Sequence, residues 1–184
     1  IRIDVDITPN ITLTSVSAYA ESKLDRTVDL DSTAARSLDI RAYGSIKAFN
    51  QEIRFSGKFG PATWIFGVNY DDLKTEDNTD YIGFHYIGND PLSFANTQIG
   101  FVDDWANDFS TKLKTYAVFG NVDFELADRL TLTAGARYTE NKQSASYCHN
   151  DPDLGTSGVF ETFSKLFGAP ADFSVDAGQC FALG

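Results

Sequence analysis

Apolar and polar residues alternate most regularly between residues 116 and 139. From Tyr116 to Leu126 the even positions are apolar or glycine, and most of the odd positions are polar or small. The same period of two continues from Leu130 to Thr139 after a short break at 127–129. Strict alternation is typical of a strand with two unlike faces, and so short a break is typical of a hairpin. We therefore predict two adjacent antiparallel strands here.

Two further pairs of alternating segments occur earlier in the chain. Phe49 to Ser56 alternates, and after a turn at 57–61 the alternation resumes from Trp64 to Asp71. The segment from Ile1 to Thr8 also alternates, and a turn at Pro9-Asn10 leads into a less regular segment that reaches about Leu24. We therefore predict an all-β, antiparallel fold of about six strands in three hairpins.

The connections between these segments are strongly unequal in length. Those near residues 9, 60 and 128 are short, whereas 27–46, 77–110 and 147–184 are long. Long structureless connections are uncommon in compact soluble domains. Short turns at one end and long loops at the other are typical of outer-membrane β-barrels. A soluble β-sandwich would show the same alternation, so the pattern by itself leaves both architectures open.

Aromatic residues and total charge narrow this choice. No segment approaches the roughly 18 apolar residues that a membrane helix needs, so only strands could cross a bilayer. Aromatic side chains near the ends of the predicted strands favour the membrane, because such rings collect at its interfaces. They are Trp64, Phe66, Tyr70, Tyr116 and Tyr138. The formal net charge of −11 argues against nucleic acid as a partner.

The residues indicate neither an enzyme nor a cofactor. There is no nucleophile-elbow, zinc-protease or phosphate-loop motif, and the chain has only two histidines, His85 and His149. The two cysteines, Cys148 and Cys180, both lie in the last irregular stretch. We expect them to form a disulfide, which implies an oxidising compartment. The alternative of two free thiols stays open, and a zinc site lacks a second histidine at metal-binding spacing.

Three segments resemble the barrel of TonB-dependent outer-membrane receptors. The first is Asn50–Gly57, reading NQEIRFSG, and the second is Trp64–Tyr70, reading WIFGVNY. The third runs from Tyr116 to Thr139 and ends in GARYT. Leu13–Tyr19 is of the same type. The segments occur in the family's order, cover about half of the chain and are separated by variable loops.

This resemblance implies a plugged barrel of about 22 strands in the outer membrane of a Gram-negative bacterium. Residues 1–184 would then be a fragment of a larger barrel, as expected for a chain without Met that begins inside an alternating run. The implied function is TonB-dependent uptake of a scarce nutrient such as a ferric siderophore, haem, cobalamin or saccharide. The implied partners are the bilayer, lipopolysaccharide, the ligand and TonB, which would bind through an N-terminal region outside this chain.

Two other functions remain open from the sequence: a passive outer-membrane porin and a secreted carbohydrate-binding β-sandwich. If the receptor interpretation holds, the short turns are periplasmic and the long loops extracellular. Arg54, Glu52 and Arg137 would then face the interior as ionic braces of the wall. The sequence does not identify the substrate.

The long loops are the expected place for ligand contact, because function concentrates in loops on a rigid scaffold. Residues 77–110 contain six Asp, no Lys or Arg, and many aromatic residues. Rings among polar groups suit sugars or flat chelates, although they could equally pack the loop against itself. The ligand-contact candidates are Tyr81, Phe84, His85, Tyr86 and Trp105. In the last loop, Phe160, Phe163 and Phe167 recur at helical spacing and predict a short helix with Ser157 as N-cap and Gly168 as stop.

Overall fold

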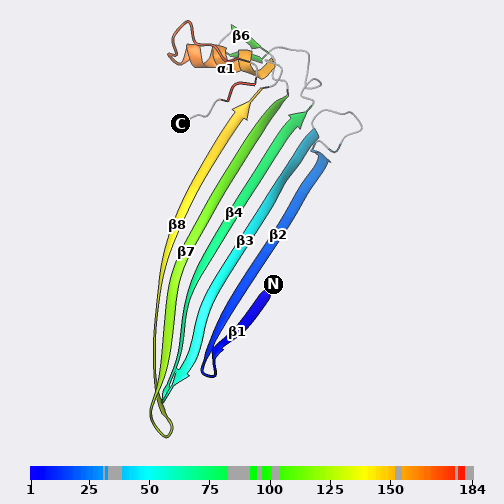
Figure 1. The fold of residues 1–184 in the computed structure, drawn as a ribbon. Coiled ribbons are helices and arrows are strands. Elements are labelled where there is room, and N and C mark those ends of the chain that lie inside the picture. The colour runs from blue at the N-terminus through cyan, green and yellow to red at the C-terminus, as the bar shows by residue number, and fades with distance from the viewer. Residues whose placement is uncertain are drawn as a thin grey trace. The chain divides into compact units, whose positions relative to one another are not determined.

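The main element of the protein is a six-stranded antiparallel sheet in which neighbouring strands follow chain order (Figure 1). The computed structural model describes residues 1–30, 32, 39–82, 92–94, 97–100, 104–151, 155–176 and 178–180. The strands are β1 (Arg2–Thr8), β2 (Ile11–Asp29), β3 (Asp39–Phe59), β4 (Ala62–Ile82), β7 (Trp105–Ala127) and β8 (Leu130–Asn150). The prediction of six strands in three hairpins is confirmed.

The strands are longer than the alternation predicted, and the loops are correspondingly shorter. β3, β4 and β8 each have 21 residues and β7 has 23, although about 9–11 residues are enough to cross a bilayer. The predicted long connections therefore begin too early and end too late. The physical reason is that both faces of the added strand segments carry polar side chains, so the period-two signal is lost while the backbone pairing continues.

The three short connections are tight turns. In β1–β2 the pairing places Val5 opposite Leu13 and Asp4 opposite Thr14, so that like faces meet, with an irregularity between Asp6 and Thr8. The β3–β4 turn contains Gly60 at φ 56°, and the β7–β8 turn contains Arg129 at φ 76°. Positive φ is common in two-residue hairpin turns because it matches the twist of the flanking strands.

The chain divides into two compact units. The first comprises Ile1–Ser22, Ile46–Thr75 and Thr111–Ser144, and the second comprises Lys23–Ser45, Glu76–Ser110 and Ala145–Gly184. In the first unit, exposed large apolar side chains occur at alternate positions of β1, β3, β4, β7 and β8. Representative members of this apolar band are Ile3, Val5, Ile53, Phe55, Phe66, Val68, Val118, Val122, Phe124 and Leu132.

An exposed apolar sheet face is the opposite of what a soluble sandwich shows. Among the described residues only Ala117 and Val175 are buried hydrophobic residues, and the members of the apolar band are exposed. A sandwich would bury this face in its core. The alternative of a soluble carbohydrate-binding sandwich is therefore wrong for this fold, and an apolar solvent is the environment that the band requires.

The opposite face of the first unit is polar and internally bonded. Arg2 forms an ion pair with Asp4 at 2.8 Å, and the Thr14 hydroxyl donates to the same carboxylate at 2.6 Å. Arg54 pairs with Glu52 at 3.3 Å. These partially exposed groups keep contact with water and with one another, as lumen-facing side chains of a large barrel do.

Trp64 lies near the start of β4 as predicted, but the three tyrosines do not lie at strand ends. Tyr70, Tyr116 and Tyr138 are inside β4, β7 and β8 because those strands continue beyond them. They instead mark the end of the apolar band that is farther from the short turns. The Tyr70 and Tyr116 ring centroids are 5.2 Å apart. The aromatic residues thus mark a boundary in side-chain polarity, and the backbone pairing passes through it.

The second unit adds a short hairpin and one helix to the strand segments it contains. β5 (Leu92–Phe94) pairs with β6 (Thr97–Gly100), and α1 (Gly155–Leu166) lies against β6 (Figure 1). The helix ends as predicted: Gly168 has φ 102°, its N–H donates to the Lys165 carbonyl, and the Ala169 N–H donates to the Ser164 carbonyl. These two bonds define a Schellman motif.

The predicted N-cap of this helix is wrong. The helix begins at Gly155, so Ser157 lies within its first turn. The cap is supplied from outside by Asp151, whose carboxylate accepts the Ser157 N–H at 2.5 Å. A carboxylate here is favoured because the first N–H groups of a helix lack partners and the helix dipole is positive at this end. In the described part of the chain, no helix is long and apolar enough to span a membrane.

A first prediction concerns Gly67, which is buried in the first third of β4. A Cβ at this position would lie 2.5 Å from the Phe119 ring and 3.0 Å from Arg54 Cβ. We expect Gly67→Ala in the full-length protein to lower the free energy of unfolding by about 1–3 kcal/mol, because the ring must move. Urea unfolding in lipid or detergent measures this.

Gly120→Ala is the matched control for this experiment. A Cβ on Gly120 would meet its nearest atom at 3.5 Å, an ordinary van der Waals contact. Both glycines lie inside long strands, so both substitutions change the backbone freedom of the unfolded chain alike. Equal unfolding free energies for the two variants would contradict the close approach of Phe119 to Gly67.

Candidate functional site

Three aromatic rings from three strands gather in the second unit. Tyr81 near the end of β4 stacks on Trp105 at the start of β7, with ring centroids 4.6 Å apart and an interplanar angle of 19°. His149 near the end of β8 lies 6.4 Å from the Trp105 ring. Offset stacking of this kind stabilises the ring positions beyond the burial of apolar area. We call Tyr81, Trp105 and His149 the aromatic cluster.

The side-chain oxygen of Asn107 contacts both the histidine of this cluster and Tyr147. This Oδ1 atom lies 2.5 Å from His149 Nδ1 and accepts the Tyr147 hydroxyl at 2.9 Å. Because an amide oxygen only accepts, the Nδ1 atom must carry the proton of the neutral ring. The Nε2 atom is then the unprotonated nitrogen, which accepts hydrogen bonds or binds metals.

Burial affects the charge of the histidine. Partial burial lowers the pKa of His149 below its ordinary value of 6.5, and the nearby carboxylate of Asp151 opposes this shift in part. The imidazole is therefore neutral at pH 7. An uncharged, half-buried ring beside an indole and a phenol forms a surface suited to flat or apolar ligand parts rather than to strongly anionic ones.

On the strand face opposite the aromatic cluster, side chains near the same strand ends form an ionic network. Arg41 binds Asp25 through two parallel contacts, Nε to Oδ1 at 3.1 Å and Nη2 to Oδ2 at 2.9 Å. The Arg41 guanidinium also lies 4.9 Å from the Tyr43 ring centroid, and the Tyr43 hydroxyl approaches Asp80 at 3.4 Å. Burial raises the pKa of Asp80 above its ordinary value. Bidentate pairing orients these strand ends relative to each other.

The structure describes some of the predicted ligand-contact residues and not others. Tyr81 and Trp105 are in direct contact although they lie 24 residues apart in the sequence. Phe84, His85 and Tyr86 lie outside the described residues. The sequence reasoning missed His149, Asn107 and Tyr147. The signal that could have found them is the shared parity of 105 and 107 and of 147 and 149, which places each pair on one strand face.

The expected disulfide is present. Cys148 and Cys180 are bonded, with their Cα atoms 5.0 Å apart. Two backbone donors support the same closure: the Gly178 N–H bonds to the Asp151 carbonyl, and the Val175 N–H bonds to Glu161 Oε1 at 2.6 Å. The segment after α1 is thus fastened both to the end of β8 and to the helix. In the described residues no group of three potential metal ligands is found.

A second prediction concerns this disulfide. Cys148→Ser with Cys180→Ser in the full-length protein removes a cross-link between residues 32 apart, which chain entropy values at about 3–4 kcal/mol. We expect residues 155–180 to become several-fold more sensitive to limited proteolysis. Wild-type protein treated with reductant should show the same sensitivity, and the double variant should not respond to reductant. Equal protection of the reduced and oxidised forms would contradict a structural role for the bond.

A third prediction concerns the charge of His149. Its folded-state pKa is lowered, so the stability contributed by the neutral ring is present above pH 6.5 and is lost as pH falls through the folded-state value. NMR of histidine-labelled full-length protein should show His149 titrating below pH 6.5, with its resonance identified by its absence in His149→Gln. A titration midpoint at or above 6.5 would contradict the half-buried, Nδ1-protonated arrangement.

Comparison with known proteins identifies the family. A family model described as TonB dependent receptor-like, beta-barrel, matches residues 2–169. The crystal structure of the ferric yersiniabactin uptake receptor FyuA from Yersinia pestis is similar in fold, with a TM-score of 0.55 and 18% identity over 78% of this chain. The chain spans 20% of the length of that receptor. Among curated proteins, none matches the sequence. Because the family model covers most of the strands, the chain belongs to the TonB-dependent receptor-like β-barrel family.

Proposed function

We propose that this chain is a section of the wall of an outer-membrane receptor that takes up a scarce small-molecule nutrient in a TonB-dependent manner. The observation that carries the proposal is the exposed apolar band on one face of a hydrogen-bonded sheet whose other face is polar. Lipid is the solvent that stabilises such a band, and paired strands leave few backbone groups unsatisfied there. Membership in a family of transport barrels supports the same conclusion and argues against an enzyme.

The band locates the bilayer along the strands. On β7 the exposed apolar positions run from Tyr116 to Leu126, and on β8 from Leu130 to Tyr138. These lengths suit the roughly 25 Å apolar band of an outer-membrane barrel. The short turns follow at once, whereas on the other side the strands continue. We assign the short turns to the periplasm and the long connections to the cell exterior.

The remaining strands, the plug and the TonB-binding segment would lie elsewhere in the protein. The described residues contribute six strands to the main sheet, too few for a closed barrel of the family's size. The lipid contacts would include lipopolysaccharide. A passive porin has an open lumen and needs no energy source, so abolishing the proton gradient across the inner membrane separates the two functions. Uptake through a receptor stops, whereas diffusion through a porin continues.

The aromatic cluster is the proposed ligand-contact site of this section. It combines a stacked Tyr81–Trp105 pair with a neutral His149, and continued strand alternation would place it on the lumenal side. Flat chelates, haem-like rings and sugar faces all stack on such surfaces. The similar fold of a ferric yersiniabactin receptor makes a ferric siderophore the first ligand class to test.

A fourth prediction tests this site. We expect Trp105→Ala and Tyr81→Ala in the full-length receptor to weaken ligand binding about tenfold each, because an aromatic contact contributes roughly 1–1.5 kcal/mol beyond area burial. Binding is measured with a panel of ferric siderophores, haem, cobalamin and oligosaccharides, and uptake with the ligand that binds.

The matched control for this panel is Tyr43→Ala, which removes an aromatic residue from the ionic network of the opposite strand face. Ligand binding should be unchanged in this variant. Wild-type affinity in both cluster variants, or an equal loss in Tyr43→Ala, would show that the cluster does not contact ligand.

A further inference from the structure

Asn107 lies between two aromatic side chains on one face of β7. Because successive strand residues point to opposite faces, Trp105, Asn107 and Phe109 share a face, and each is about 7 Å from the next. Phe109 is 41% exposed, and Asn107 is partly exposed. An amide at this spacing from two rings is within reach of a small ring or chelate that stacks on either of them.

The orientation of this amide is fixed by two neighbours on β8. The Asn107 Oδ1 atom lies 2.5 Å from His149 Nδ1 and accepts the Tyr147 hydroxyl at 2.9 Å. These two donors use both lone pairs of the same oxygen. A carboxamide directs its oxygen and its nitrogen differently from one carbon, so the N–H2 group of Asn107 points away from its two partners.

The amide nitrogen of Asn107 has no acceptor among the residues that the structure describes. This nitrogen carries two N–H donors, and a partly buried donor is costly unless water or a ligand satisfies it. Asn150 differs, because its amide donates to Asp108 at 2.8 Å on the other face of the same two strands. The Asn150 amide thus links the strands, whereas the Asn107 amide keeps two donors that a ligand can use.

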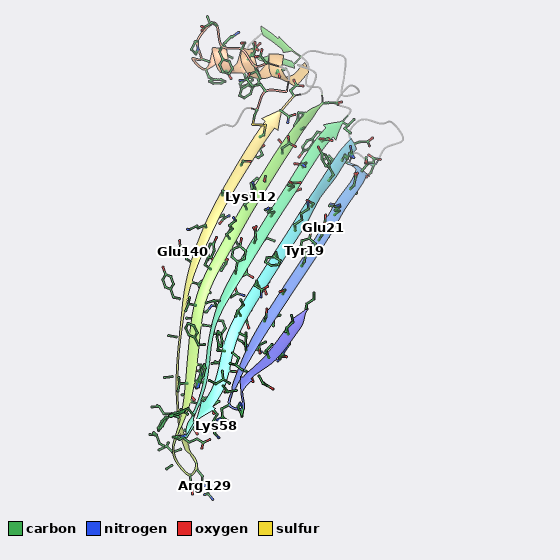
Figure 2. All side chains as sticks on the ribbon, viewed as in Figure 1. Tyr19, Glu21, Lys58, Lys112, Arg129 and Glu140 are labelled. Carbon is green, nitrogen blue, oxygen red and sulfur yellow. A yellow bond between two sulfur atoms is a disulfide. The ribbon has the colours of Figure 1, made fainter. Side chains whose placement is uncertain are left out.

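The charges near the cluster determine which kind of acceptor suits these donors. Residues 77–110 contain no Lys or Arg. Lys58 and Arg129 lie at the short-turn ends of their strands (Figure 2), whereas Trp105 lies at the start of β7. Arg41 is held by a carboxylate on the opposite strand face. Residues 77–110 therefore offer an anionic oxygen no counter-charge, and an uncharged carbonyl or hydroxyl oxygen is the better acceptor.

We propose that Asn107 is a specificity-determining residue of the aromatic cluster, and that its N–H2 group donates to an uncharged oxygen at the edge of a ligand stacked on Trp105. The inference rests on the proposed function and names the ligand class of the same site. That class is a neutral molecule with a flat or ring-shaped apolar face bordered by hydroxyl or carbonyl oxygens. Sugar rings and neutral chelates with hydroxamate carbonyls share this chemistry. Ligands with only ammonium groups at that edge are rejected, because the amide nitrogen donates and does not accept.

A fifth prediction tests Asn107 in the full-length receptor. Asn107→Asp and Asn107→Leu nearly keep the shape of the side chain and remove its two N–H donors. The probes are a neutral oligosaccharide, a neutral ferric trihydroxamate and a negatively charged ferric tricatecholate. We expect the wild type to bind one of the neutral probes, which identifies the source of the oxygen. Both variants should bind that probe about tenfold more weakly, because one or two hydrogen bonds are lost.

Asn78→Asp is the matched control for these variants. Asn78 is a partly exposed residue of β4 in the second unit, and strand alternation places it on the face opposite Tyr81. The substitution makes the same change from amide to carboxylate away from the cluster, so binding should be unchanged. The heat-modified shift of the barrel in gel electrophoresis verifies that each variant is folded.

A spectroscopic measurement separates the donor role of Asn107 from simple packing. Nitrogen NMR of histidine-labelled wild type should show neutral His149 protonated at Nδ1, because the Asn107 oxygen accepts there. Asn107→Leu should lose this preference, and Asn107→Asp should raise the pKa of His149, because a carboxylate stabilises the imidazolium. A wild-type ring protonated at Nε2 would mean that the amide turns its N–H2 group toward the histidine, and this result would overturn the proposal.

The binding outcomes also distinguish this inference from the proposed function. Unchanged binding of the neutral probes in folded Asn107→Asp and Asn107→Leu would overturn the inference, as would wild-type binding of the tricatecholate alone. If Trp105→Ala and Tyr81→Ala weaken binding while the Asn107 variants do not, the cluster contacts ligand without this amide. The proposed site then stands and this inference fails. If none of the four variants weakens binding, both fail.

Discussion

The arrangement of one hydrogen-bonded sheet with an exposed apolar face is the constraint on which the rest of the structure depends. Each strand satisfies backbone groups through its neighbours, so the sheet can present Phe66, Val118 or Leu132 to an apolar solvent without exposing unpaired backbone there. A water-soluble fold would need a second layer over these side chains. The polar opposite face, with ion pairs such as Arg54–Glu52, is stable only if water reaches it. Both requirements are met together in the wall of a wide membrane barrel.

Continuation of the strands beyond the apolar band explains where the candidate sites lie. Once outside hydrocarbon, both strand faces can carry polar and aromatic residues, and backbone pairing still fixes their positions. Asn107 can therefore hold His149 and Tyr147 from the neighbouring strand, and Trp105 can stack on Tyr81. Candidate ligand contacts placed on paired strands are better ordered than contacts in free loops, which favours preorganised recognition.

The boundary of the apolar band, marked by Tyr70, Tyr116 and Tyr138, and the segment after α1 are held in place by different interactions. At the boundary, Tyr70 and Asp72 are ordered by strand alternation and by the change of solvent from lipid to water. After α1, where no sheet continues, a disulfide, a carboxylate cap from Asp151 and a glycine stop at Gly168 take over. Short helices have little stability of their own, so covalent and capping restraints are needed to hold α1 in place.

The sequence alone predicted about six strands, the hairpin partners, the unlike faces and the family, because each depends on local alternation, on short turns or on ordered motifs. It favoured the disulfide over free thiols, and the structure shows the bond. It also identified Tyr81 and Trp105 as candidates. Only the tertiary structure decided that the apolar face is exposed, that the strands extend to Asp29, Ile82 and Asn150, and that Asp151 caps α1. The contact of Trp105 with His149 also required it. The physical reason is that these features depend on contacts between segments far apart in the chain, including the register between strands. Where both strand faces are polar, the sequence shows no alternation from which that register could be predicted.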